Sequence, residues 1–147
     1  MSTVSEKLMS LVEDFSDLSI NDRLNLLLEF SDGLPELPLH LADHPDLLER
    51  VEECQSPVYL FVEIDENRFG RLYFSAPREA PTTRGFASIL HELLDNQPVD
   101  EILAIDEDFI NRLGLAEAIS PLRLRGMRAM LHRAKRQLQE KSIAVRS

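Results

Sequence analysis

The residue with the clearest chemical potential in the sequence is Cys54, the one cysteine in the chain. Two acids, Glu52 and Glu53, precede it, and a polar pair, Gln55 and Ser56, follows it. Free cysteine is usually packed as a small buried hydrophobe, but these polar neighbours and the loop that they predict favour a functional thiol. Nearby carboxylates disfavour a thiolate. The local sequence therefore favours a thiol that receives or hands on a group over one that attacks a carbonyl unaided.

Two further residues stand out by their position in predicted helices. Gly85 is expected in the first turn of a helix, where glycine costs about 1 kcal/mol relative to alanine. Close approach of another backbone would explain it, and so would a helix start whose free N–H groups favour an anionic sulfur. If Ser120 is an N-cap, Arg123 is the third helical residue, where the helix dipole disfavours a cation by roughly 0.3–1 kcal/mol. A role toward a partner and plain solvation both remain open for Arg123.

The four histidines are weak candidates for metal binding or catalysis. His40 and His44 are four residues apart, but prolines on either side interrupt any helix that would align them. Two nitrogens without a third ligand make a poor zinc site, so we expect no metal site. A cysteine–histidine hydrolase would need His91 or His132 beside Cys54, and the sequence has no pairing signature for it. This alternative stays open, together with a helical adaptor in which the thiol is inert.

The charge of the chain is strongly negative and unevenly spread. A formal net charge of −10 argues against nucleic-acid binding, yet residues 121–147 hold eight of the 16 Lys and Arg residues and one acid. A basic last helix on an acidic body could steer a protein partner or balance the fold itself. We expect no signal peptide and no membrane span, because long apolar runs are missing. The lone cysteine is then expected to be a free thiol in a reducing cytoplasm.

Apolar periodicity and capping residues predict the elements that must position these side chains. A capping box at Ser19 and Asp22 opens the second helix, and Ser120 with Pro121 opens the last one. Two strand-like runs joined by a polar link ending at Gly70 predict a β-hairpin. We expect a single domain over residues 1–147, of the α+β class, with helices packed on a small antiparallel sheet. Helices are predicted at 4–15, 19–33, within 79–98 with a threonine cap, at 99–103, at 108–113 and from 120 onward, a helical turn at 47–51, and strands at 58–64 and 71–76.

Four segments, in this order, resemble the SufE family. They are LPEL at 34–37, ECQSPVYL at 53–60, EAPTTRGFASIL at 79–90 and SPLRLRGMRAML at 120–131. The resemblance implies a SufE/IscU-like fold, without the metal ligands of the scaffold protein IscU. It also implies a sulfurtransferase-type carrier, with no turnover of its own, that accepts persulfide sulfur from a cysteine desulfurase for iron–sulfur cluster assembly.

The resemblance assigns roles to the residues around the thiol. Cys54 is implied to carry the persulfide, in a loop formed with Glu53, Gln55 and Ser56. Many members of the family have glycine before the cysteine, where this chain has Glu53. A single thiol suits a sulfur carrier, because a second nearby cysteine would attack the persulfide and release its sulfur as a disulfide formed.

The resemblance also implies the partners. Arg123 would contact a SufS-type cysteine desulfurase, and the helix start at Glu79, Arg84 and Gly85 would add to that surface. The pyridoxal phosphate belongs to the desulfurase, so no cofactor is implied for this chain. A SufBCD-type scaffold would take the sulfur afterwards.

Overall fold

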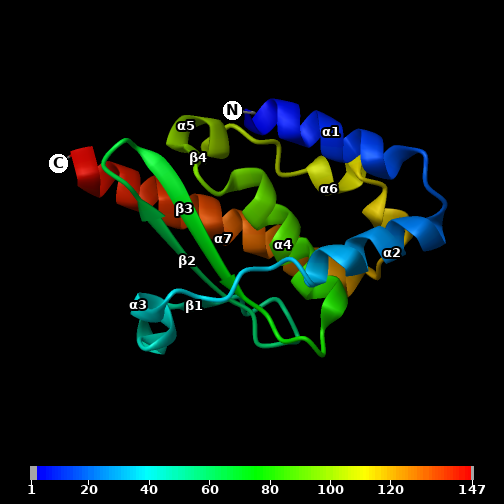
Figure 1. The fold of residues 1–147 in the computed structure, drawn as a ribbon, viewed down its shortest axis with the longest axis horizontal. Coiled ribbons are helices and arrows are strands. Elements are labelled where there is room, and N and C mark those ends of the chain that lie inside the picture. Colours follow the sequence, from blue (N-terminus) through cyan, green and yellow to red (C-terminus); the bar gives the residue numbers. More distant parts are fainter. Residues whose placement is uncertain (1–2, 147) are drawn as a thin grey trace.

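The structure is a computed structural model that describes residues 3–146. Figure 1 shows helices on one face of a small twisted sheet, with the long C-terminal helix running along the strands. The helices are α1 Val4–Ser16, α2 Ile20–Ser31, α3 Leu39–Ala42, α4 Pro81–Leu94, α5 Val99–Leu103, α6 Phe109–Arg112 and α7 Pro121–Arg146, with short 3-10 helices η1 Pro45–Leu47 and η2 Leu115–Glu117. The strands are β1 Glu49–Arg50, β2 Tyr59–Ile64, β3 Phe69–Ser75 and β4 Gln97–Pro98.

The sheet is antiparallel, with its strands in the order β1-β2-β3-β4. The predicted hairpin is confirmed as β2 and β3, whose register runs from the pair Tyr59 and Ser75 to the pair Ile64 and Gly70. Alternate side chains on the two strands are buried, as expected for a sheet with one covered face. The class is therefore α+β, as the sequence predicts.

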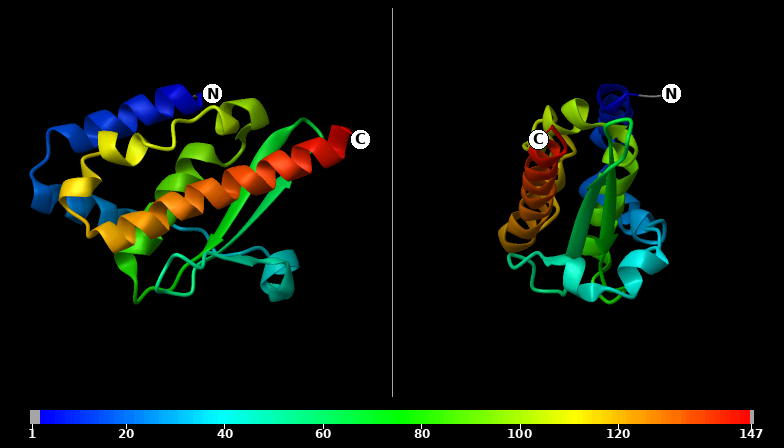
Figure 2. Two further views of the ribbon diagram at one scale, coloured as in Figure 1. Left: turned by 180° about the vertical axis from the view of Figure 1, so that it is seen from behind. Right: turned by 90° about the vertical axis from the view of Figure 1, so that its left-hand side faces the viewer.

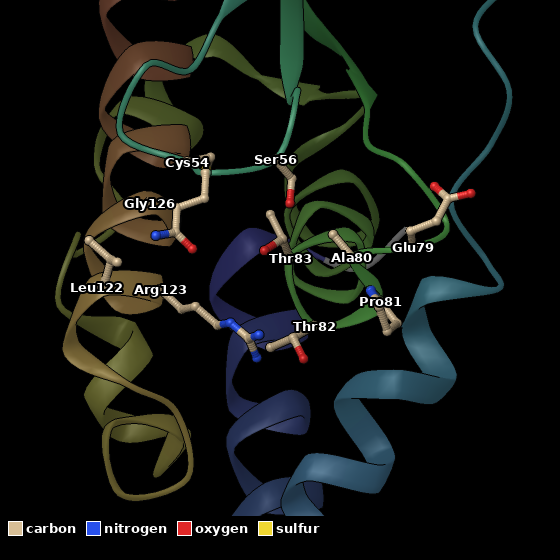
Figure 3. Close-up of a pocket in the computed structure, with 11 residues that line it drawn as sticks. Cys54, Ser56, Glu79, Ala80, Pro81, Thr82, Thr83, Leu122, Arg123 and Gly126 are labelled. Atoms are coloured by element: carbon tan, nitrogen blue, oxygen red, sulfur yellow. The ribbon is translucent and has the colours of Figure 1, made fainter.

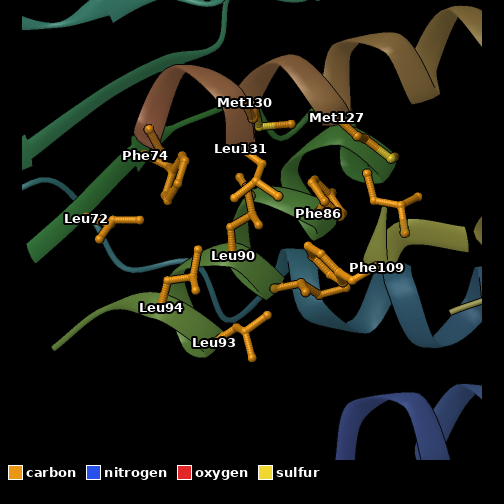
Figure 4. Packing of buried hydrophobic residues seen from close by; sticks show 14 of the residues in the cluster. Leu72, Phe74, Phe86, Leu90, Leu93, Leu94, Phe109, Met127, Met130 and Leu131 are labelled. Atoms are coloured by element: carbon orange, nitrogen blue, oxygen red, sulfur yellow. The ribbon is translucent and has the colours of Figure 1, made fainter. Parts of the chain in front are cut away.

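The core lies between this sheet face and the helices α4 and α7. Helix α7 packs along β2, and α4 packs along β3 and against α2; Figure 2 shows the same arrangement from two further sides. Figure 4 shows Phe86 and Leu90 of α4 beside Met127 and Leu131 of α7. Apolar residues at helical spacing on α7 are buried in this core: Leu124, Met127, Leu131, Ala134 and Leu138.

The predicted caps of α2 and α7 are confirmed. The Ser19 hydroxyl accepts the backbone N–H of Asp22 at 3.2 Å, and the Ser120 hydroxyl accepts that of Arg123 at 3.4 Å. The predicted threonine cap of α4 is wrong. That helix begins at Pro81 with Ala80 as N-cap and no side-chain cap bond, because proline supplies a preset φ and has no N–H to satisfy.

The predicted helical turn at 47–51 is also wrong. Glu49 and Arg50 form β1 and pair with Leu60 and Tyr59 of β2, while the helical turns lie earlier, in α3 and η1. A two-residue strand has no periodicity of its own, so the free edge of β2 decides its conformation. This edge strand leads directly into the cysteine loop.

Beyond the short β1, side chains of α7 cover the edge of β2. The Gln137 amide oxygen accepts the N–H of Val62 at 2.9 Å, and the Lys141 ammonium donates to the Val62 carbonyl. Two polar side chains thus satisfy a strand edge that would otherwise be open to another strand. The same contacts fix α7 against the sheet, and with it every α7 residue that faces the cysteine loop.

Candidate functional site

The loop between β1 and β2 carries Cys54 and folds back on itself. The Val51 N–H donates to the Val58 carbonyl at 2.8 Å at the base of the loop, and the Cys54 N–H donates to the Val51 carbonyl at 3.0 Å. Cys54 is only 8% exposed, although its neighbours Glu52 and Gln55 are exposed. The polar local sequence did not predict this burial, because the surface that covers the thiol comes from another part of the chain.

That surface is the backbone of α7 at Gly126. A β-carbon at this position would lie 2.8 Å from the Cys54 sulfur and 3.4 Å from the Cys54 α-carbon. Real β-carbons essentially never approach another heavy atom as closely as the first of these distances. A side chain here would therefore force the thiol or the loop to shift, and Gly126 is a site residue that the sequence analysis missed.

A small pocket of about 130 Å³ opens beside the thiol. Figure 3 shows Arg123 extending from α7 toward Thr82 at the start of α4, with Cys54 and Ser56 above them. The pocket is lined by Cys54, Gln55 and Ser56, by residues 79–83 and by Leu122, Arg123 and Gly126. The structure thus brings together three of the predicted loop residues and two of the predicted partner-binding residues, Glu79 and Arg123.

Two other predicted partner-binding residues lie elsewhere. Arg84 is buried, and its guanidinium donates to the carbonyls of Ser31 at 2.8 Å and Ala76 at 2.6 Å. Gly85 faces α2, where a β-carbon would lie 2.2 Å from the Leu27 carbonyl oxygen. Close packing of two helix backbones explains this glycine, and contact of either residue with a partner stays a prediction that their burial does not favour.

The thiol is held in its protonated form. Burial, and to a smaller extent the Glu53 carboxylate, raise the pKa of Cys54 to about 11, although the Arg133 cation acts in the opposite direction. From the sequence, the neighbouring acids Glu52 and Glu53 were expected to disfavour the thiolate. The larger cause is loss of solvation, which disfavours the charged thiolate, and the acid that contributes is Glu53.

Arg133 of α7 is a second residue that the sequence analysis missed. Its Nε donates to Glu53 Oε1 at 3.0 Å, and its Nη1 donates to Glu49 Oε2 at 2.8 Å. One guanidinium therefore joins the cysteine loop, strand β1 and helix α7. Arg133 and Glu53 are 80 residues apart in sequence, so no local pattern could have paired them.

No histidine is among the residues that line the Cys54 pocket in the described part of the chain. His91 lies 3.5 Å from Asp95, and His132 is an exposed side chain 3.4 Å from Glu107. The cysteine–histidine pairing that a thiol hydrolase needs is therefore not formed in this structure. Within residues 3–146, no group of three or more His, Cys, Asp or Glu side chains is placed to hold a metal ion.

Comparison with known proteins identifies the family of this chain. The family model described as the Fe-S metabolism associated domain, SufE, matches residues 9–138. The chain belongs to the SufE family. A SufE-like protein of Mycobacterium tuberculosis is 57% identical over 133 residues, which cover 90% of this chain and 92% of that protein. SufE-like protein 1 of Arabidopsis thaliana, chloroplastic/mitochondrial, is 38% identical over 82 residues, which cover 56% of this chain and 22% of that protein.

A solved structure shares this fold. The solution structure of a hypothetical protein from Thermus thermophilus matches with a TM-score of 0.79 and 36% sequence identity, over 91% of this chain and 94% of that chain. The family and the fold that the four sequence segments indicate are therefore both correct. Among the described residues of this SufE protein, none of the helices is long and apolar enough to cross a bilayer.

Proposed function

We propose that this SufE protein is a sulfur carrier that accepts persulfide sulfur on Cys54 from a cysteine desulfurase. The observation that carries the proposal is the position of the chain's one thiol. Its sulfur lies against Gly126, at a pocket that the side chain of Arg123, on the same helix, also lines. A family associated with Fe-S metabolism supplies the chemical context.

The transfer is a thiol–persulfide exchange. The Cys54 thiolate attacks the outer sulfur of a cysteine persulfide on the desulfurase, a new S–S bond forms on Cys54, and the desulfurase thiolate leaves. The number of electrons is conserved, since one S–S bond forms as another breaks. The proton of the Cys54 thiol must go to a base in the complex, because a thiol is a poor nucleophile.

The resting state suits a carrier that reacts only with its partner. With a pKa of about 11, roughly one Cys54 in ten thousand is ionised at neutral pH. Small oxidants react with exposed thiolates, so a buried and protonated thiol is protected from them. Docking on the desulfurase must then expose the loop or bring positive charge to it.

The proposal extends to the partners and the compartment. We assign a SufS-type desulfurase as the sulfur donor, stimulated when Cys54 removes the outer sulfur, and a SufBCD-type scaffold for iron–sulfur clusters as the acceptor. The pyridoxal phosphate stays on the desulfurase. A persulfide carrier with one free thiol requires a reducing compartment, and we assign the cytoplasm.

Peptide mapping by mass spectrometry tests the proposal. The full chain is incubated with a SufS-type desulfurase and L-cysteine, and the peptide that contains Cys54 is analysed without reduction. A gain of one sulfur atom on Cys54, lost on treatment with a thiol reductant, is the expected result. If the desulfurase turns over while Cys54 gains no sulfur, the carrier proposal is wrong and the inert adaptor is favoured. An acyl adduct with a thioester substrate would instead favour the hydrolase.

A further inference from the structure

An ion pair between Glu53 and Arg133 joins the cysteine loop to α7. The Arg133 Nε and Nη2 lie 3.0 and 2.9 Å from the same carboxylate oxygen of Glu53. The side chains are 23% and 29% exposed, so water screens this pair only in part. Glu53 directly precedes the thiol, and its position therefore controls whether Cys54 lies against α7.

Arg133 is itself held in place from the other side. Its Nη1 contacts Glu49 of β1, and Glu49 also accepts hydrogen bonds from Arg136 and Gln137 of the same helix. Arg133 therefore stays anchored to β1 when Glu53 moves away. Of the two acids that it binds, Glu53 belongs to the loop and Glu49 to the sheet, so the contact with Glu53 is the one that can open.

The other bonds of the loop do not hold it against the helix. The bonds from Val51 to Val58 and from Cys54 to Val51 join residues within the loop itself. Among the hydrogen bonds and ion pairs of the described residues, the pair of Glu53 with Arg133 joins this loop to α7, next to the packing of Cys54 on Gly126.

We propose that Arg133 is a positioning residue that latches the Cys54 loop shut through Glu53, and that release of Glu53 exposes the thiol for sulfur transfer. The second half of this statement rests on the proposed carrier function, whereas the latch is a property of the free protein. The desulfurase would open the loop by offering Glu53 a cation of its own.

The latch and simple electrostatics predict opposite effects of removing Arg133. Its positive charge lowers the pKa of Cys54, so loss of the charge alone leaves less thiolate and slows the reaction of Cys54 with iodoacetamide. Loss of a latch opens the loop and makes that reaction faster. The sign of the change in rate therefore separates a positioning role from a purely electrostatic one.

The test is the alkylation rate of Cys54 in the full-length free protein at pH 8, with Arg133→Gln compared with wild type. Arg128→Gln is the matched control, because Arg128 lies on the same helix and its guanidinium contacts Asn111 and Asp108. We expect Arg133→Gln to react about fivefold faster, the scale of one partly exposed ion pair, and Arg128→Gln to react at the wild-type rate. An equal or slower rate for Arg133→Gln overturns the latch.

Hydrogen–deuterium exchange of the peptide that spans 51–58 gives a readout that does not depend on the thiol pKa. Exchange should be faster in both Arg133→Gln and Glu53→Gln, and the double variant should exchange no faster than either single one, since the same contact is removed. Additive acceleration would contradict a shared contact. If Arg133→Gln fails to fold, Glu53→Gln alone decides, and exchange at the wild-type rate overturns the latch. None of these results depends on whether Cys54 accepts sulfur, which the mass-spectrometric experiment tests separately.

Discussion

The sulfur of Cys54 lies directly over Gly126, where a β-carbon would be only 2.8 Å away. Cys54 and Gly126 come from distant parts of the chain. The thiol can be buried against α7 because residue 126 has no side chain. This relationship makes the site sensitive to the smallest possible substitution.

Gly126→Ala should expose Cys54 without changing any charge. The new methyl group displaces the loop, while alanine in place of glycine favours the helix by up to about 1 kcal/mol. We therefore expect a free energy of unfolding within about 1 kcal/mol of wild type, together with faster alkylation of Cys54 by iodoacetamide. Chemical denaturation measures the free energy of unfolding, and the alkylation rate measures the exposure of Cys54. Unchanged alkylation would show that the loop accommodates the methyl group in its closed position.

Cys54→Ser should abolish stimulation of a SufS-type desulfurase and leave the fold in place. The thiol is buried against α7, so the substitution carries some cost, which we expect near ~1 kcal/mol because the pocket beside it is partly polar. Desulfurase assays and denaturation curves measure the two effects. A loss above about 2 kcal/mol would assign Cys54 a mainly structural role.

Arg123→Ala should weaken sulfur acceptance without weakening α7. The exposed Arg123 lines the Cys54 pocket, and its cation lies in the first turn of the helix, where the dipole disfavours it. Arg125→Ala is the matched control, since Arg125 is an exposed arginine on the same helix that does not line this pocket. Equal desulfurase stimulation by the two variants would remove Arg123 from the site.

The raised pKa of Cys54 predicts how its contribution to stability varies with pH. The folded protein keeps its proton up to a pKa of about 11, above the ordinary value of 9.0, so the folded state binds more protons than the unfolded state between these values. Stability due to this thiol is then fully present below pH 9 and is lost as pH rises toward 11.

A comparison with Cys54→Ala isolates this contribution, because the other titrating groups are common to both proteins. Relative to the variant, the wild type should lose about 1 kcal/mol of unfolding free energy between pH 8 and pH 10. Urea denaturation at the two pH values measures it. A difference that does not change with pH would mean that the thiol is less desolvated than its position on Gly126 indicates.

The sequence predicted the parts of the fold that depend on neighbouring residues. Ser19 and Ser120 mark their helix starts through bonds three residues away, and the hairpin is predicted by two strand-like runs with Gly70 between them. The strand at Glu49 and Arg50 was not predictable in this way, because it exists only through pairing with β2.

The same division holds for the site. Cys54, its loop and Arg123 could be singled out from residue types and positions, and the resemblance to SufE assigned Arg123 to the partner surface. The burial of the thiol and its contact network could not be predicted from the sequence, because Gly126 and Arg133 meet the loop only after α7 has packed on the sheet. The burial of Arg84 was equally hidden from the sequence, since a charged residue near a helix start here donates to carbonyl groups inside the protein.

Alkylation of Cys54 within the complex tests most directly whether the loop opens when a desulfurase docks. The rate of reaction of Cys54 with iodoacetamide is measured in the free protein and again with a saturating SufS-type desulfurase that lacks its own nucleophilic cysteine. We expect slow alkylation of the free protein and clearly faster alkylation in the complex, since docking removes the burial that keeps the thiol protonated. Fast alkylation of the free protein, with no increase on docking, would contradict a thiol that is closed at rest and opened by its partner.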